Sequence, residues 1–306
     1  MAKNIVCVGE AMLELARAGD AWTLGYGGDT LNTAIHLARS GLDTAYLTAL
    51  GDDPFSSDLR DKWTAEGLDC SLVMSDPARG PGLYAITNDA QGERSFTYWR
   101  DNSAAKGMFA LDGMKAVLTG AGHADLLVYS LISLAILPIS ARDALFSLSG
   151  KVRANGGKVA FDGNYRPRLW VNKAETIATR DAAIACADIG LPTLEDEALL
   201  SGEADADAAA SHWQGLGCAE VIVKLGAKGC RLPDGSIIPP PDILAPVDTS
   251  GAGDAFNGGY LAARMQGASI ADAALAGHRL AGWVVMRQGA IPARDDDAPY
   301  GNLARG

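Results

Sequence analysis

The sequence has few of the residues that mark metalloproteins and disulfide-stabilised proteins. Its five cysteines among 306 residues are scattered, form no CxxC pair and are odd in number. We therefore expect reduced thiols and a cytoplasmic location. The four histidines lie far apart without the spacing of metal ligands, which argues against a histidine-based metal site. Helical periodicity around His36 predicts that this histidine lies on a helix surface.

Long apolar runs and an excess of positive charge are also absent. The N-terminal stretch MAKNIVCVGEAMLELA reaches a glycine and a glutamate after an apolar run too short for a signal-peptide core or a membrane span. The 26 Lys and Arg residues against 37 Asp and Glu give a formal net charge of −11. This charge argues against nucleic acid or an anionic membrane as a partner, and a small anionic ligand would need local positive charge.

Strand-like and helix-like segments alternate along most of the chain. The runs IVCVGE, TAYLTALG, DLLVYS, KVAFDGN and EVIVKLG are typical of buried strands, and segments such as TLNTAIHLARSG and DPFSSDLRDKWTAEG are typical of helices. Such alternation predicts an α/β fold with a mostly parallel sheet covered by helices on both faces. The length suits one large domain, and we expect residues 1–306 to form a single one.

One region departs from this alternation. Between about Pro81 and Arg100, GLYAITND and RSFTYWR are strand-like and are joined by the turn-rich AQGE, which indicates a β-hairpin. With MLELARAGDAWTLG near the start, the hairpin is expected to form a small antiparallel sheet that projects from the main domain. Alternation places Phe96, Tyr98 and Arg100 on one face, with Tyr84 on the partner strand. This face is either ordinary cross-strand packing or a wall for a carboxylate-bearing sugar.

Polar residues follow several glycine-rich turns. Gly27-Gly28-Asp29 precedes a helix that carries Asn32 one turn later. The glycines either form a turn capped by Asp29 or let a polyhydroxylated ligand approach the backbone. FDGNYRPRLW places Asn164, Arg166 and Arg168 just past a predicted strand end, where open α/β sheets bind ligands.

Two further turns carry lysine or aspartate. KLGAKG, from Lys224 to Gly229, is a surface turn or a source of positive charge for an anion, and the chain contains neither GxxxxGK(S/T) nor GxGxxG. DTSGAGDAFNGGYLAAR sets Gly251-Ala252-Gly253 and then Asp254 ahead of a helix. Asp254 is either a helix cap or a catalytic base beside an anion held by backbone N–H groups.

The N-terminal GGD…N and the C-terminal DTSGAGDAFNGGYLA together resemble the ribokinase-like (phosphofructokinase-B) sugar kinases, over essentially the whole chain. The resemblance implies an α/β, ribokinase-like three-layer sandwich with a mostly parallel central sheet and a small β lid formed by about 11–26 and 81–100. Within the family, GGDTLN, GLYAI, SFTYWR and FDGNYRPRLW resemble the 2-keto-3-deoxygluconate kinases, which phosphorylate O6 of that sugar acid with ATP. The alternatives are a neutral-sugar kinase of the fructokinase or ribokinase type and a sugar-binding protein without catalysis.

The resemblance also implies roles for individual residues. Asp254 matches the catalytic base, and Gly251, Ala252 and Gly253 match the anion hole that faces the transferred phosphate. The residues that match sugar-acid contacts are Gly28, Asp29, Asn32, Tyr84, Tyr98, Arg100 and Arg166. The residues that match nucleotide contacts are Asn164, Lys224, Gly226, Lys228, Gly229, Gly251 and Gly253.

The resemblance also leads to expectations about the cofactors and the oligomeric state. The resemblance implies ATP with Mg²⁺, and Asp248 and Ser250 match the place where relatives hold a monovalent cation. Thr193 and Asp196 stand where many relatives carry Asn and Glu, so the metal ligands stay unassigned. The helix dipole is expected to keep Asp254 ionised. We also expect a homo-oligomer formed through the lid, because two strands alone are marginal in water.

Overall fold

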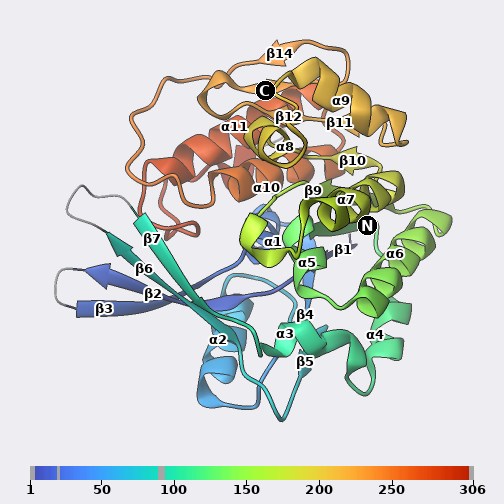
Figure 1. Cartoon of the computed structure of the whole chain (residues 1–306). Coiled ribbons are helices and arrows are strands. Elements are labelled where there is room, and N and C mark those ends of the chain that lie inside the picture. The colour runs from blue at the N-terminus through green and yellow to red at the C-terminus, as the bar shows by residue number, and fades with distance from the viewer. Residues whose placement is uncertain (1–3, 19–20, 89–93, 303–306) are drawn as a thin grey trace.

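The computed structural model describes residues 4–18, 21–88 and 94–302, and its seven-stranded central sheet is parallel throughout (Figure 1). The strand order is β11-β10-β9-β8-β1-β4-β5. The bounds are β1 Asn4–Val8, β4 Asp43–Leu50, β5 Val73–Ser75, β8 Leu126–Ser130, β9 Lys158–Asp162, β10 Ile189–Gly190 and β11 Glu220–Val221. Each apolar run singled out in the sequence contributes a strand, so the prediction of a mostly parallel sheet is confirmed.

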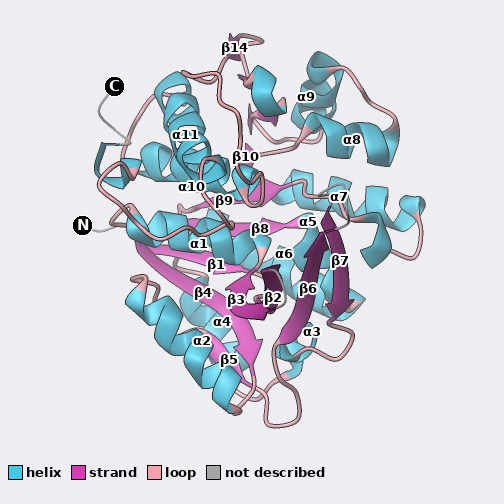
Figure 2. Ribbon diagram, turned by 90° about the vertical axis from the view of Figure 1, so that its left-hand side faces the viewer, coloured by secondary structure: helices cyan, strands magenta, loops and turns pink. Residues whose placement is uncertain are grey.

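Helices cover both faces of this sheet (Figure 2). Alternate residues of β1 show the division, because Ile5 and Cys7 lie in one buried apolar cluster and Val6 and Val8 in the other. The first cluster is closed by α1 (Asp29–Arg39), α2 (Pro54–Ala65), α10 (Ala252–Met265) and α11 (Ile270–Val285). The second is closed by α3 (Ala104–Gly107), α4 (Met114–Ala121), α5 (Leu131–Ile136), α6 (Ile139–Ala154), α7 (Lys173–Cys186), α8 (Leu194–Ser201) and α9 (Ala206–Gly215). The expected three-layer sandwich is confirmed.

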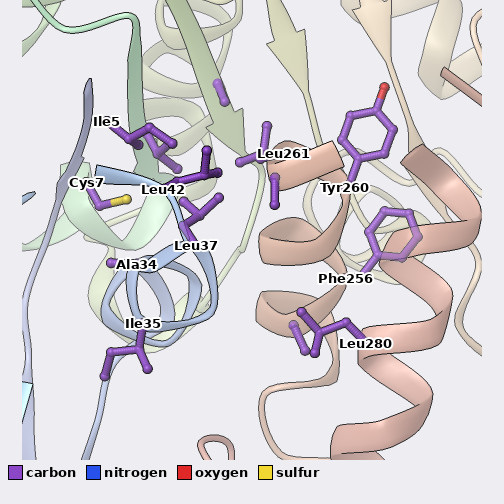
Figure 3. Close-up of a cluster of buried hydrophobic side chains, with 14 of the residues drawn as sticks. Ile5, Cys7, Ala34, Ile35, Leu37, Leu42, Phe256, Tyr260, Leu261 and Leu280 are labelled. Atoms are coloured by element: carbon purple, nitrogen blue, oxygen red, sulfur yellow. The ribbon is translucent and has the colours of Figure 1, made fainter. Parts of the chain in front are cut away.

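Helix α1 packs between the central sheet and helix α10. Figure 3 shows Ile35 and Leu37 of α1 in the same apolar cluster as Phe256 and Leu261 of α10. The prediction that His36 lies on a helix surface is wrong, because its side chain is fully buried. His36 Nδ1 lies 2.8 Å from the Tyr300 hydroxyl oxygen. Periodicity on one helix did not reveal that both faces of α1 are covered.

A second, four-stranded sheet stands away from the central one (Figure 1). Its order is β3-β2-β6-β7, with β2 Met12–Ala18, β3 Ala21–Gly27, β6 Gly82–Asn88 and β7 Arg94–Trp99. The β2/β3 and β6/β7 pairs are antiparallel, but β2 pairs with β6 in parallel, so the expectation of an antiparallel sheet is wrong there. Both strands leave the carboxyl edge of the central sheet, after β1 and β5, and run outward together. The predicted AQGE turn lies outside the described residues.

The C-terminal half adds a small antiparallel sheet and several short helices. The segment EVIVKLG, expected as one strand, divides into β11 of the central sheet and β12 of this small sheet. The remaining elements are β12 Val223–Lys224, β13 Cys230–Arg231, β14 Ile237–Ile238, η1 Met108–Ala110, η2 Pro167–Leu169, η3 Gly226–Lys228 and η4 Pro299–Asn302.

The cysteines and the helix lengths bear on two expectations from the sequence. All five cysteines are free thiols. Within the ranges given above, no helix combines the length and the apolar character needed to cross a membrane.

Candidate active site

Most of the residues singled out by the sequence gather at the carboxyl edge of the central sheet. Strand β1 leads into β2, β9 ends at Asp162, and α1 and α10 begin at this edge. Hydrogen bonds between the segments, Asn32 to Asp254 and Asn164 to Asp29, place the N-termini of the two helices side by side. The N-terminal and C-terminal motifs therefore meet in one place although they are more than 200 positions apart, as the 222-residue separation of Asn32 and Asp254 shows.

The first turn of α10 carries the predicted anion hole and base. Gly251 is the N-cap with a φ of +69°, and a Cβ there would lie 2.5 Å from that of Ala290, so only glycine fits. The Ala252 N–H already donates to the Thr249 carbonyl oxygen at 3.3 Å. The Asp254 carboxylate accepts a 2.7 Å hydrogen bond from Asn32 Nδ2 on the neighbouring helix. A side chain held from another helix has a role beyond capping its own helix.

The charge on Asp254 differs from the expectation. Burial, followed by the nearby carboxylates of Asp29 and Asp162, raises the pKa of Asp254 to about 8, although the Asn32 hydrogen bond and the Lys224 charge lower it. The expectation that the helix dipole keeps Asp254 ionised is therefore wrong at neutral pH in this structure. Desolvation together with two like charges outweighs the dipole.

A hydrogen bond joins Asp29, predicted to contact the sugar acid, to Asn164, predicted to contact the nucleotide. Asn164 Nδ2 donates to Asp29 Oδ2 at 3.2 Å. The Oδ1 atoms of Asn32 and Asn164 are buried and have no hydrogen-bond partner within the described ranges. Glycine is required at position 28 for a structural reason, because a Cβ there would lie 2.4 Å from the Glu10 carbonyl oxygen. These unsatisfied acceptors are available to ligand hydroxyl or ammonium groups, or to water.

Lys224 lies in a buried polar network next to α10. Its Nζ atom lies 3.1 Å from Asp162 Oδ1 and 3.1 Å from Asn257 Oδ1, and Asn257 Nδ2 donates to Asp162 Oδ2 at 2.8 Å. A Cβ at Gly253 would lie 3.8 Å from Lys224 Nζ. Lys224 Nζ thus lies next to the turn that carries Asp254. Sequence reasoning missed Asp162 and Asn257, although both stand within three positions of a predicted site residue.

The rest of KLGAKG lies at the surface or in the small C-terminal sheet. Lys228 and Gly226 are exposed. Gly229 is buried, and a Cβ there would lie 2.1 Å from the Ile238 carbonyl oxygen, so its glycine is required by the pairing of β13 with β14. Among these residues only Lys224 is tied to the other site residues by a hydrogen bond within the described part of the chain.

Arg166 and Asp196 form a pair beside this network. Arg166 is more than half exposed, and its Nη1 lies 3.4 Å from Asp196 Oδ1 and donates to the Tyr165 carbonyl oxygen at 2.8 Å. Burial raises the pKa of Asp196 to about 6, although the Arg166 charge lowers it. Asp196, which replaces the usual glutamate, therefore faces a residue predicted to bind the substrate. In the described ranges no group of three or more His, Cys, Asp or Glu is placed to hold a metal ion.

One face of the four-stranded sheet is aromatic, as alternation predicted. Tyr84 pairs with Tyr98 across β6 and β7, and their ring centroids lie 6.0 Å apart. The Tyr98 ring also stacks on Phe96 at 6.3 Å. The Tyr84 hydroxyl donates to Glu14 on β2, and burial, followed by the Glu14 charge, raises the pKa of Tyr84. The charge of Asp254 contributes to the same rise, so the Tyr84 hydroxyl lies close enough to Asp254 to interact with it electrostatically.

Arg100 lies at the foot of that face and is already paired. Its Cζ atom lies 5.8 Å from the centroid of the Tyr98 ring. Its Nη2 donates to the buried carboxylate of Glu10. The sequence showed Glu10 and Glu14 only as polar residues after the first strand, and nothing in the local pattern linked them to residues 84–100.

Asp248 fastens the loop that precedes α10. Its Oδ1 accepts from the Ser250 N–H at 2.8 Å, and its Oδ2 accepts from the Gly289 N–H at 2.9 Å. The residue is buried. This arrangement joins the loop before α10 to the segment that follows α11.

Comparison with known proteins agrees with this geometry. The model of the pfkB family carbohydrate kinases matches residues 2–297. A 2-dehydro-3-deoxygluconokinase from Escherichia coli (strain K12) is 42% identical over 96% of this chain and 99% of its own length. A fructokinase from Vibrio alginolyticus is 31% identical over 77% of this chain and 75% of its own length.

The similarity extends to solved structures. A double-mutant fructokinase from Vibrio cholerae O395, determined with fructose, ADP and a potassium ion bound, superposes with a TM-score of 0.82 at 27% identity. The superposition covers 95% of this chain and 94% of that one. The match over nearly the whole length, together with the assembled GGD…N and GAGD motifs, shows that the chain belongs to the pfkB family of carbohydrate kinases.

Proposed function

We propose that this protein transfers the γ-phosphoryl group of ATP to O6 of 2-keto-3-deoxygluconate, which is 2-dehydro-3-deoxygluconate under its other name. The observation that carries the proposal is the pairing of Asp254 with Asn32 beside the buried cation Lys224. The similarity to a 2-dehydro-3-deoxygluconokinase at 42% identity supports the sugar acid as substrate. The Tyr84, Tyr98 and Arg100 face supports it further, because aromatic hydroxyls and a guanidinium suit a carboxylate-bearing sugar.

Each of these residues has a separate proposed role in the phosphoryl transfer. Asp254 takes the proton of the O6 hydroxyl as that oxygen attacks the γ-phosphorus, and the bond from phosphorus to the bridging oxygen breaks to release ADP. The N-terminus of α10, with Gly251, Ala252 and Gly253, stabilises charge on the transferred group. Lys224 supplies a positive charge next to that turn. Asn164, Gly226, Lys228 and Gly229 complete the proposed nucleotide contacts.

The sugar-acid site lies on the other side of Asp254. Asp29, Asn32 and the backbone at Gly28 are proposed to bind sugar hydroxyl groups. Arg100 and Arg166 are proposed to meet the carboxylate, with Tyr84 and Tyr98 as the wall between. Arg166 is exposed and Arg100 is buried, so a carboxylate that meets both would be partly accessible to water.

Magnesium is proposed to enter with the nucleotide. The residues fit a hydrated ion, because the Asn164 Oδ1 atom is buried and has no partner among the residues that the structure describes, and because Asp196 keeps a carboxylate near Asp162. Mg²⁺ prefers oxygen ligands and retains several waters, so Asn164 and Asp196 would hold it largely through water. When bound, it offsets the charge of the phosphates. A monovalent cation is proposed near Asp248 and Ser250, which hold the loop before α10.

We also propose that the four-stranded sheet, with residues 11–26 and 81–100, acts as a lid on a single domain of residues 1–306. Its exposed apolar residues favour pairing of two lids in a homodimer. They are Trp22, Leu24, Phe96, Tyr98 and Trp99, each between 39% and 56% exposed. The free thiols fit the reducing cytoplasm, where we place the protein.

An ADP-release assay tests the function. The purified protein with Mg²⁺ and ATP is offered keto-acids derived from gluconate and from galactonate, and the neutral sugars fructose and ribose. We expect turnover chiefly with the keto-acids and a 6-phosphate product identified by ³¹P NMR. The similarity to a fructokinase makes a neutral-sugar kinase the second candidate, and preferential turnover of fructose would establish it. A binding protein without catalysis would release no ADP with any of them.

A further inference from the structure

Glu10 and Arg100 form a buried ion pair where the four-stranded sheet meets the central sheet. Glu10 follows β1 and Arg100 follows β7, 90 positions away in the chain. The Glu10 side chain is 0% exposed and that of Arg100 is 9% exposed. Gly82 on β6 makes room for the pair, because a Cβ there would lie 3.0 Å from Glu10 Oε1 and 3.2 Å from Arg100 Cβ. Three separate segments thus build this contact.

Part of the hydrogen-bonding capacity of the pair is unused. Arg100 Nε is buried and has no hydrogen-bond partner among residues 4–18, 21–88 and 94–302, whereas Ser103 lies close enough to Glu10 to oppose, with Arg100, the rise that burial causes in the pKa of Glu10. Buried polar atoms are rarely left so, because each costs free energy unless a ligand or water meets it. Arg100 also lies beside the Tyr98 ring. Its remaining N–H groups are therefore next to the face assigned to the sugar acid.

Orientation matters for what a guanidinium binds. A carboxylate is held strongly when two parallel N–H groups meet its two oxygens, which requires the guanidinium plane to be fixed. A free arginine side chain loses rotamer entropy on binding, and a partner that fixes it beforehand removes that cost. Glu10 accepts a hydrogen bond from Nη2 and the Tyr98 ring lies beside the guanidinium, so these two contacts restrict the orientation of Arg100 before a ligand binds.

We propose that Glu10 is a positioning residue for the acidic substrate, which fixes Arg100 so that its remaining N–H groups meet the substrate carboxylate. The inference rests on the proposed function, because it requires a carboxylate on the substrate. Glu10 acts through Arg100 and touches no reacting atom. Its effect is confined to binding of the sugar acid and does not extend to ATP or to the phosphoryl transfer.

The test is a double-mutant cycle with steady-state kinetics. Glu10→Ala and Glu10→Gln are made in the full-length enzyme and again in Arg100→Leu, and KM for 2-keto-3-deoxygluconate, KM for ATP and kcat are measured. We expect Glu10→Ala to raise KM for the keto-acid by about 10-fold or more, within the range of coupled neighbours, with less than about threefold change in the other constants. Glu10→Gln should lie between, because its amide oxygen still accepts from Nη2. In the Arg100→Leu background Glu10→Ala should add nothing.

A second buried ion pair provides the control. Arg180 Nη1 and Glu197 Oε2 lie 2.7 Å apart with side chains 2% and 3% exposed, on α7 and α8. Glu197→Ala should lower Tm and leave KM for the keto-acid unchanged. The comparison separates loss of a buried ion pair in general from loss of this one.

Three results would overturn the proposal. The first is a folded Glu10→Ala enzyme with an unchanged KM for the keto-acid, and the second is an additive effect in the Arg100→Leu background. The third is an equal rise of both KM values, as a merely structural role would produce. If Glu10→Ala does not fold, Glu10→Gln decides by the same measurements. Wild-type turnover of fructose but not of the keto-acid would overturn the proposed function as well, whereas normal keto-acid turnover with unaffected Glu10 variants removes only this inference.

Discussion

Replacing Asp254 by asparagine separates a catalytic base from a helix cap by two independent measurements. The base contributes about 10²- to 10⁴-fold to the rate, so Asp254→Asn should lower kcat by that factor. Asn32 and Lys224 keep their places, so binding of ATP and of the sugar should change little. The assay is ADP release at saturating substrates, with ATP binding followed by calorimetry.

The structure also predicts whether Asp254→Asn raises or lowers the stability of the fold. The pKa of Asp254 is about 8 in the folded chain, against an ordinary aspartate value of about 3.9 when unfolded. Between these values the folded state holds a proton that the unfolded state has released, so folding stability falls as pH rises. Asp254→Asn removes this loss, and its Tm should exceed that of the wild type increasingly from pH 5 to about pH 9. A cap would behave in the opposite way, because losing a carboxylate at a helix N-terminus destabilises the helix.

The wild-type pH profile completes the test. With a pKa of about 8, only about one tenth of Asp254 is ionised at pH 7, so kcat/KM should rise about tenfold between pH 7 and a plateau above pH 9. A flat profile over this range, or a lower Tm for Asp254→Asn at pH 9, would refute the reasoning. Near-normal kcat in the variant would leave Asp254 with only a structural role in the first turn of α10.

Three further predictions follow from the same contacts. Arg100→Leu leaves the substrate carboxylate without its charged partner, a loss of about 2–5 kcal/mol in binding free energy. KM for the keto-acid should therefore rise about 30- to 5,000-fold, while KM for ATP and for fructose changes far less. An equal rise of KM for both sugars would instead assign Arg100 to holding the proposed lid. Burial, followed by the Arg39 charge, lowers the pKa of His36 to about 3. Its contribution to stability is present above about pH 6.5 and lost as pH falls, so a neutral His36→Gln variant should show a smaller drop in Tm from pH 7 to pH 4 than the wild type; equal drops would contradict this. Trp99→Glu should convert a dimer to a monomer in sedimentation velocity, and a fully active wild-type monomer at assay concentration would exclude the lid dimer.

Local patterns predicted the parts of the fold and site that depend on neighbours in the chain. Apolar runs separated by helical segments predict parallel strands, because a strand buried on both faces has no polar side. The glycine at 251 and the carboxylate at 254 are visible because a helix start constrains both residue types. The aromatic face of β6 and β7 followed from alternation alone.

The missed features all depend on residues that meet only in the folded chain. Glu10 reaches Arg100 across 90 positions, and Lys224 reaches Asp162 across 62, so no window along the sequence contains both partners. The raised pKa of Asp254 is the sum of burial and two carboxylates from other segments. The parallel pairing of β2 with β6 likewise depends on where both strands leave the central sheet.

The direct passage from β3 into α1 connects the four-stranded sheet to the residue that holds Asp254. Strand β3 ends at Gly27 and α1 begins at Asp29, so no linker absorbs movement between them. Asn32, one turn into α1, is the residue whose amide holds the Asp254 carboxylate. A change in the position of the four-stranded sheet would therefore act directly on the turn of α1 that carries Asn32, and so on the hydrogen bond that favours the ionised form of Asp254.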